Sequence, residues 1–133
     1  MKDATDLTIN EADLDGELEM QAEMFYRVAN VAAQAESKYY ETKSALDLLR
    51  AQLDRAIREA AETKMTEKAI DQEIQRNGDY QKAVRALNEA RQSRDMTKAL
   101  REAWYMRKDM LIQRTINKRA ELEHLGSGVV KAA

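Results

Sequence analysis

The sequence predicts an all-α protein: a long coiled-coil helical hairpin with a short intervening helix, assembling into a helical homo-oligomer. Composition is the first reason, because the 133 residues include no Pro, only four Gly and 35% charged residues. Such a chain lacks the turn residues of an all-β fold and the β-branched runs of a parallel sheet. The second reason is an apolar repeat of seven residues, which is the pattern of a coiled coil.

The first predicted helix carries this repeat from Leu18 to Ala60 without a break, and we expect it to span about residues 15–62. A strict seven-residue repeat keeps its seam against a partner only if the helix supercoils left-handedly. The repeat positions are Leu18, Phe25, Ala32, Tyr39, Leu46, Leu53 and Ala60, with Gln21, Val28, Ala35, Thr42, Leu49 and Ala56 three residues later. Within this seam the predicted oligomer contacts are Phe25, Tyr39, Leu46, Leu49 and Leu53.

Two further helices follow the first. Thr66 is a suitable N-cap for a short helix that runs to Arg76. Gly78 is expected in the left-handed conformation that ends this helix, and Asp79 is expected to cap the next one. The last helix should then span residues 80 to about 125. The chain therefore divides into an acidic flexible N-terminus (1–13), one helical coiled-coil domain (14–125) and a disordered tail (126–133).

The last helix has an apolar face too broad for one antiparallel partner. Two readings remain open. The face packs against both the first helix and a neighbouring subunit, or it docks a partner protein through adaptable Met side chains. The first reading is favoured, because two very long helices in a chain of this size have little else to cover them. It makes Trp104, Met106 and Met110 oligomer contacts.

Chemistry that depends on metals or nucleophiles is not expected. The chain has no Cys and a single His, His124, which leaves no ligand set for zinc and no His-dependent dyad. Neither a glycine-rich phosphate loop nor a known hydrolase motif occurs. We therefore expect no enzyme, no metal site and no cofactor. No window approaches the roughly 18 apolar residues of a membrane span, and the acidic start is unlike a signal peptide, so a cytoplasmic protein without a membrane partner is expected.

The formal net charge of −2 hides a strong asymmetry along the chain. Residues 1–36 hold nine acids against two basic residues, whereas residues 79–133 hold twelve Lys and Arg against seven acids. An acidic start and a basic last helix indicate a polyanionic partner.

One row of the last helix concentrates this positive charge at alternating steps of three and four residues. Such a row, with a Tyr among the cations, is suited to follow a sugar-phosphate backbone while the ring stacks on a base. The alternative is that the cations pair with acids of the first helix or keep a coiled-coil flank solvated. The row consists of Arg91, Arg94, Lys98, Arg101, Tyr105 and Lys108, flanked by Arg107 and Arg114.

A second basic cluster, formed by Arg55, Arg58 and Lys64, lies at the end of the first helix and in the loop after it. The sequence alone leaves open which of the two clusters contacts nucleic acid.

The order of these elements resembles the UvsY family of phage recombination mediators. The resemblance covers about residues 20–128 and rests on the start of the first helix at Glu23-Met24-Phe25-Tyr26-Arg27-Val28-Ala29, on Thr66-Glu67, on Asp79-Tyr80 and on Trp104. It implies a ring-shaped homo-oligomer that binds single-stranded DNA, helps displace single-strand-binding protein and loads a RecA-like recombinase. It also implies DNA contacts at Arg55, Arg58 and Lys64. The loop at 62–67 is shorter, and the last helix more basic, than in the best-known member.

The predicted function is that of a non-enzymatic recombination mediator that binds single-stranded DNA, in the cytoplasm of the host cell if the chain is phage-encoded. The alternative is a coiled-coil structural adaptor, or an inhibitor that binds a protein partner without nucleic acid.

Overall fold

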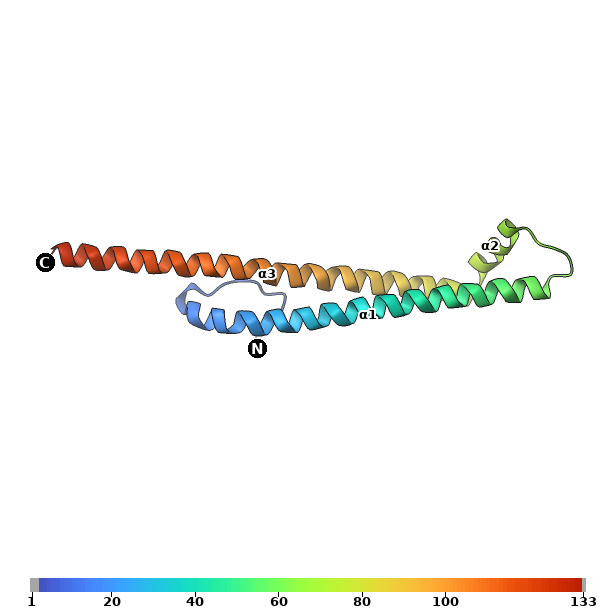
Figure 1. Cartoon of the computed structure of the whole chain (residues 1–133), viewed down its shortest axis with the longest axis horizontal. Helices are drawn as coiled ribbons and strands as arrows, with labels where there is room; N and C mark the ends of the chain where they lie inside the picture. The colour runs from blue at the N-terminus through green and yellow to red at the C-terminus, as the bar shows by residue number, and fades with distance from the viewer. Residues whose placement is uncertain (1–2, 133) are drawn as a thin grey trace. The chain divides into compact units, whose positions relative to one another are not determined.

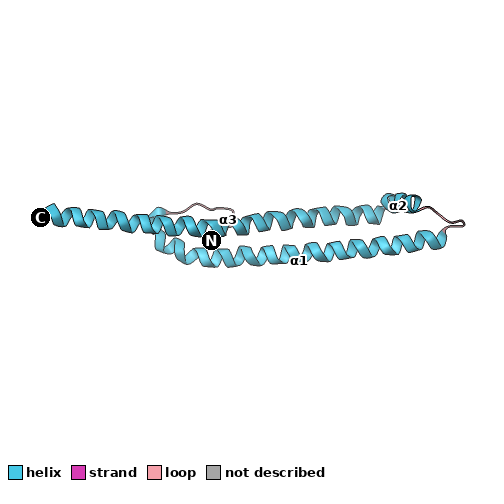
Figure 2. Cartoon of the chain, turned by 45° about the horizontal axis from the view of Figure 1, so that its top comes forward, coloured by secondary structure: helices cyan, strands magenta, loops and turns pink. Residues whose placement is uncertain are grey.

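In the computed structural model, helices make up all of the regular secondary structure of the described residues (Figures 1 and 2). A short 3-10 turn at Glu11–Asp13 leads into α1 (Leu14–Ala60), which is followed by α2 (Glu67–Arg76) and α3 (Gly78–Ala132). The structure describes residues 3–132 and the side chains of residues 3–126, and no strand occurs among them. The prediction of an all-α fold with a short helix between two long ones is confirmed. The predicted disorder of residues 1, 2 and 133 lies outside the described residues.

The contacts divide the chain into two compact units. The first unit combines residues 1–31 with residues 97–133, and the second consists of residues 32–96. Both α1 and α3 therefore contribute one section to each unit. The sequence predicts a single helical domain over residues 14–125, and its periodicity did not predict this division.

The second unit is held together by the apolar face of α2. Ile70 and Ile74 are fully buried there against Tyr80 of α3. Side chains from α1 complete this cluster, including Leu46 and Leu53. Leu46 also packs against a second cluster of Tyr39, Leu87 and Ala90.

These contacts correct part of the predicted oligomer interface. Tyr39 is buried within its own chain, and Leu46 and Leu53 are partly buried there. Leu49 is likewise half-buried on α1. Within the second unit, side chains of α2 and α3 cover Tyr39, Leu46 and Leu53. The heptad pattern did not take the apolar face of α2 into account.

The core of the first unit is built around Trp104. Its side chain is 0% exposed and packs with Met24 and Val28 of α1. Leu100 of α3 and Ala4 of the N-terminal segment flank this cluster. Trp104 is therefore a core residue of its own chain, and its prediction as an oligomer contact is wrong.

In the first unit, the buried stripe of α1 keeps two positions of the predicted seam, Gln21 and Val28, and shifts the other two by one residue, to Glu17 and Met24. Leu18 is exposed and Phe25 is only half-buried, although both were expected to face the partner helix. The inward residues are Glu17, Gln21, Met24 and Val28.

A change of spacing accounts for this shift. Met24, Val28 and Ala32 are buried at two consecutive steps of four, whereas a heptad alternates steps of three and four. An extra step of four residues in place of a step of three locally unwinds a coiled coil. The boundary between the units falls at the same place, between Val31 and Ala32. From Ala32 to Leu53 the predicted heptad positions are buried or half-buried, whereas the last two, Ala56 and Ala60, are exposed.

The helix ends differ from the sequence predictions in two places. The Thr66 side chain accepts a hydrogen bond from the Ala69 amide at 3.1 Å, which confirms the predicted cap of α2. The next cap is Asn77 instead of Asp79, since the Asn77 side chain accepts from the Tyr80 amide at 3.0 Å. No described residue has positive φ, so Gly78 does not adopt the expected left-handed conformation.

At its other end, α3 continues through Gly126 to Ala132. A glycine inside a helix costs only about 0.5–1 kcal/mol relative to Ala, which is too little to end a long helix. The prediction that α3 stops near residue 125 is wrong.

Replacement of Ile74 by Ala should destabilise the second unit by about 2–5 kcal/mol, because it opens a cavity in a fully buried site. Urea denaturation followed by circular dichroism measures the loss. The matched control is Leu48→Ala at an exposed position of α1, where a change within about 0.5 kcal/mol is expected. Equal losses in the two variants would contradict the assigned core.

Candidate nucleic-acid interface

The predicted basic row of α3 is divided between the two units. Lys98, Arg101, Tyr105 and Lys108 belong to the first unit, and Arg91 and Arg94 belong to the second. We call the four residues of the first unit the basic face. They occupy successive turns of one continuous helix at steps of three and four residues, which places them on one side of α3.

The basic face reaches the surface. Tyr105 is 53% exposed, Lys98 is exposed, and Arg101 and Lys108 are half-buried. Among the described residues, no carboxylate lies within ion-pair distance of Lys98 or Arg101. Lys108 has only a long contact of 4.0 Å with its neighbour Asp109. The cations of this face therefore keep most of their charge available to an external anion.

Tyr105 lies between an aromatic ring and a cation. Its ring centroid is 6.1 Å from that of Phe25, with an interplanar angle of 53°. The Lys108 ammonium lies 4.2 Å from the centre of the Tyr105 ring. A hollow beside the two rings is lined by Phe25, Arg101, Glu102, Tyr105 and Met106. The sequence assigned Phe25 to the oligomer seam and did not predict that it adjoins the basic face.

In the second unit, Arg91 and Arg94 surround a tyrosine. The Arg94 guanidinium lies 4.0 Å from the centre of the Tyr39 ring, and that of Arg91 lies 5.9 Å away. Arg94 also pairs with Asp95 at 3.0 Å. Hydrogen bonding from Arg91 lowers the pKa of the Tyr39 hydroxyl, because a cation stabilises the phenolate. These two arginines are engaged within the chain, unlike Lys98 and Arg101.

Arg107 was predicted to flank the nucleic-acid row, and that prediction is wrong. Arg107 is only 3% exposed, and its guanidinium donates a hydrogen bond to the carboxylate of Glu17. It also donates to Gln21 Oε1 at 2.8 Å and lies over the Trp104 ring at 4.7 Å. A buried charge persists only when it is paired and hydrogen-bonded. Arg107 therefore holds the first unit together and is not accessible to an external ligand.

The N-terminal segment completes the environment of Arg107. The guanidinium donates to the backbone carbonyl of Leu7 at 3.0 Å and to that of Thr8 at 2.7 Å. The indole nitrogen of Trp104 donates to the carbonyl of Ala4 at 2.6 Å. The described part of the segment that we expected to be flexible is thus packed on α3. The physical reason is that buried donors need acceptors, and an extended backbone supplies them.

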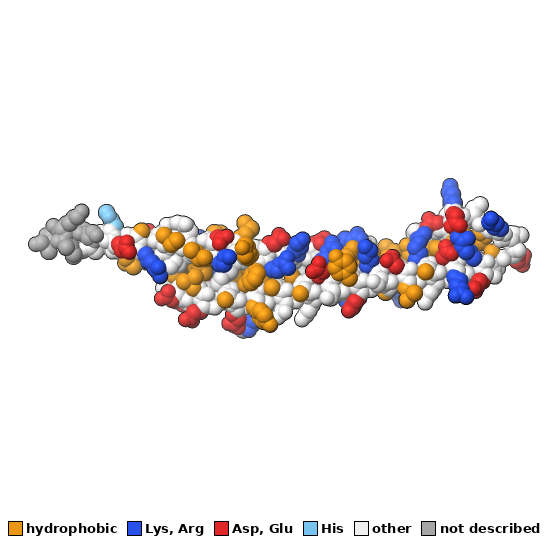
Figure 3. Space-filling view, viewed as in Figure 1, with side chains coloured by type: hydrophobic (Ala, Val, Ile, Leu, Met, Phe, Trp, Pro, Cys, Tyr) orange, Lys and Arg blue, Asp and Glu red, His pale blue; other side chains and the backbone are white. Residues whose placement is uncertain are grey.

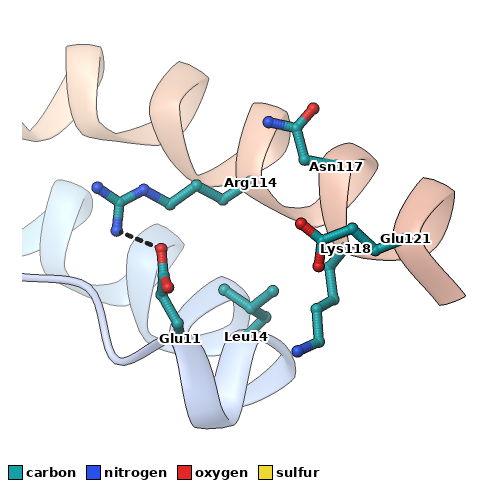
Figure 4. A pocket seen from close by; sticks show the side chains of 6 residues that line it. All are labelled: Glu11, Leu14, Arg114, Asn117, Lys118 and Glu121. Carbon is teal, nitrogen blue, oxygen red and sulfur yellow. Dashed lines mark hydrogen bonds and ion pairs between the residues drawn. The ribbon is translucent and has the colours of Figure 1, made fainter.

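The segment is also anchored by charge near the start of α1. Glu11 accepts a hydrogen bond from Arg114 at 3.0 Å, as the dashed line in Figure 4 shows. The remaining side chains of this shallow pocket are Leu14, Asn117, Lys118 and Glu121. Acids and bases alternate around it, so it offers no concentrated charge to a ligand. Arg114 is occupied by this contact and adds nothing to the basic face.

The second predicted cluster, at the end of α1, is largely neutralised. Arg55 pairs with Glu59 at 2.9 Å, and Arg58 pairs with both Asp54 and Glu67 at 2.7 Å. The hydrogen bonds that Arg58 donates to these two acids raise the pKa of its guanidinium. Lys64 is exposed in the loop between α1 and α2.

Two predicted oligomer contacts stay exposed. Met106 is 66% exposed and Met110 is 54% exposed. Hydrophobic side chains, in orange, reach the surface among charged ones in Figure 3. These two residues are available to a second chain, whereas Trp104 is not.

Comparison of the chain with protein-family models, with curated proteins and with solved structures finds no match. Within the described residues there is no group of three or more acids or histidines arranged to hold a metal ion. In the same part of the chain, no helix has a stretch apolar enough to cross a lipid bilayer.

Removal of the Glu17 carboxylate should destabilise the first unit by about 3–5 kcal/mol, because Arg107 would keep a buried charge without its counter-ion. The variant is Glu17→Ala, measured by urea denaturation. Glu19→Ala, at an exposed position of the same helix, serves as the control and should change the stability by no more than about 0.5 kcal/mol. A Glu17→Ala variant as stable as the control would refute the structural role of Arg107.

Proposed function

We propose that the chain is a non-enzymatic protein that binds single-stranded DNA through the basic face of α3 and acts as a recombination mediator. One observation carries this proposal: Lys98 and Arg101 are free of ion pairs among the described residues, and they lie two turns and one turn, respectively, before the exposed Tyr105. Unpaired cations interleaved with an aromatic ring suit a backbone of phosphates and unstacked bases.

The basic face is a better candidate than the cluster at the end of α1. Phosphates compete for a cation only by displacing the acids already paired with it. Arg55 and Arg58 would each have to release a carboxylate, whereas Lys98 and Arg101 would release only water and counterions. Counterion release favours binding to a polyanion, so the strand contacts the basic face first.

We assign the mediator role from the resemblance between the order of elements in this chain and that of the UvsY family. A single basic face makes only a few phosphate contacts, which are weak at physiological salt. A homo-oligomer repeats that face and raises the affinity through avidity. A strand held in this way is a poorer substrate for single-strand-binding protein and a better one for a RecA-like recombinase. We propose these two proteins as partners on the same ground.

Salt dependence tests the DNA-binding part of the proposal. The logarithm of affinity for a labelled single-stranded oligonucleotide, measured by anisotropy, should fall with the logarithm of salt by about 0.7 per phosphate contacted. Lys98→Gln with Arg101→Gln should reduce that slope by about 1.4. Arg55→Gln with Arg58→Gln is the matched control and should leave it unchanged. Absence of binding at low salt, or equal effects of the two pairs, would overturn the assignment.

Solution mass tests the oligomer. Light scattering should give a mass of several chains for the wild type, because Met110 presents an exposed apolar side chain that a second chain would cover. Met110→Glu should reduce the mass to one chain while the helix content stays the same. Gln92→Glu, an exposed polar position on α3, is the control. An unchanged mass in Met110→Glu would exclude this interface.

A further inference from the structure

We infer that the hollow beside Phe25 and Tyr105 receives an unstacked nucleobase, so that this face distinguishes single strands from duplexes. The inference rests on the proposed function and goes beyond it. It assigns base binding to Phe25, which the heptad pattern predicts to be an oligomer contact. Three of the five lining residues are Phe25, Tyr105 and Met106, which give the hollow an apolar wall that contains two aromatic rings.

The wall is held in place by the core beneath it. Phe25 is half-buried and packs against the cluster of Met24, Val28 and Trp104. The Tyr105 ring packs beside the Phe25 ring, with the two ring centroids 6.1 Å apart. Both rings are therefore ordered before a ligand arrives, which lowers the entropy lost on binding. The Lys108 ammonium, 4.2 Å from the centre of the Tyr105 ring, does not line the hollow, so a base there does not have to displace it.

The charges around the hollow separate the base from its phosphates. Glu102 lines the hollow itself, and its carboxylate repels a phosphate that would enter there. Arg101 stands on the same wall, and Lys98 lies one turn earlier on α3. The arrangement therefore admits a neutral base and keeps the phosphates outside, beside these two cations.

The same features disfavour an apolar helix as the occupant. A packed helix would remove Arg101 and Lys98 from water, and no acid of this chain lies within ion-pair distance of either among the described residues. Desolvation of an unpaired charge is costly. The phosphates of an anionic strand compensate that charge while a base packs against the two rings. The occupant is therefore a single strand. Duplex DNA presents its bases already stacked and paired, and it cannot offer one to the hollow without melting.

The experiment compares a thymidine oligonucleotide with an abasic strand of the same length, which has the same phosphates and no bases. Tyr105→Leu should weaken binding of the thymidine strand by about five-fold or more for each stacked base. It should leave abasic binding and the salt slope unchanged. Tyr26→Leu is the matched control, because Tyr26 is 68% exposed on α1 and does not line the hollow.

A second measurement does not depend on the folding of any variant. Light-induced cross-linking of a 5-iododeoxyuridine oligonucleotide to the wild-type chain should map to Tyr105 or Phe25 by peptide mass. Equal losses of thymidine and abasic binding in Tyr105→Leu, no loss in either, or a cross-link confined to residues 55–64 would overturn the inference while leaving DNA binding intact. If neither strand binds the wild type, the proposed function itself fails.

Discussion

The guanidinium of Arg107 is buried inside the first unit. The packing of α1 and of the N-terminal segment against α3 follows from the need to compensate this one buried charge. Its donors reach Glu17 and Gln21 on α1 and the carbonyls of Leu7 and Thr8 in the N-terminal segment. Each of these contacts fixes a different part of the chain against α3. Because leaving any donor of a buried cation unmet is costly, α1 cannot slide along α3 and the N-terminal segment cannot leave without weakening the unit.

This constraint explains where the sequence was informative and where it misled. Helix type, the approximate helix bounds, the Thr66 cap and the heptad from Ala32 to Leu53 follow from local patterns of residues. The register of α1 before Ala32 does not, because a rule that places apolar residues inward selects Leu18 and Phe25. The structure places Glu17 inward instead, since Arg107 requires an acid. A signal was available: Glu17, Gln21, Met24 and Val28 also have helical spacing, but two of the four are polar.

The candidate site shows a similar division. The spacing of Lys98, Arg101, Tyr105 and Lys108 was enough to place them on one face of α3. Sequence could not separate cations that are free from those that are engaged, because the partners of Arg107 and the Tyr39 ring beside Arg94 are brought to them only by the fold. Nor could it place Phe25 beside Tyr105, 80 positions later in the chain. That contact adds two neighbouring aromatic rings to a row of cations. It depends on how α1 and α3 pack in the first unit.

The burial of Trp104 has a practical consequence for the study of this molecule. It is the only tryptophan in the chain, it is shielded from water, and its indole N–H is held by the carbonyl of Ala4. The intrinsic tryptophan emission of the protein therefore reports on one place alone, the contact between the N-terminal segment and α3 within the first unit. The second unit contains Tyr39, Tyr40 and Tyr80 but no indole, so tryptophan emission monitors the first unit, whereas far-ultraviolet circular dichroism monitors the helices of both units.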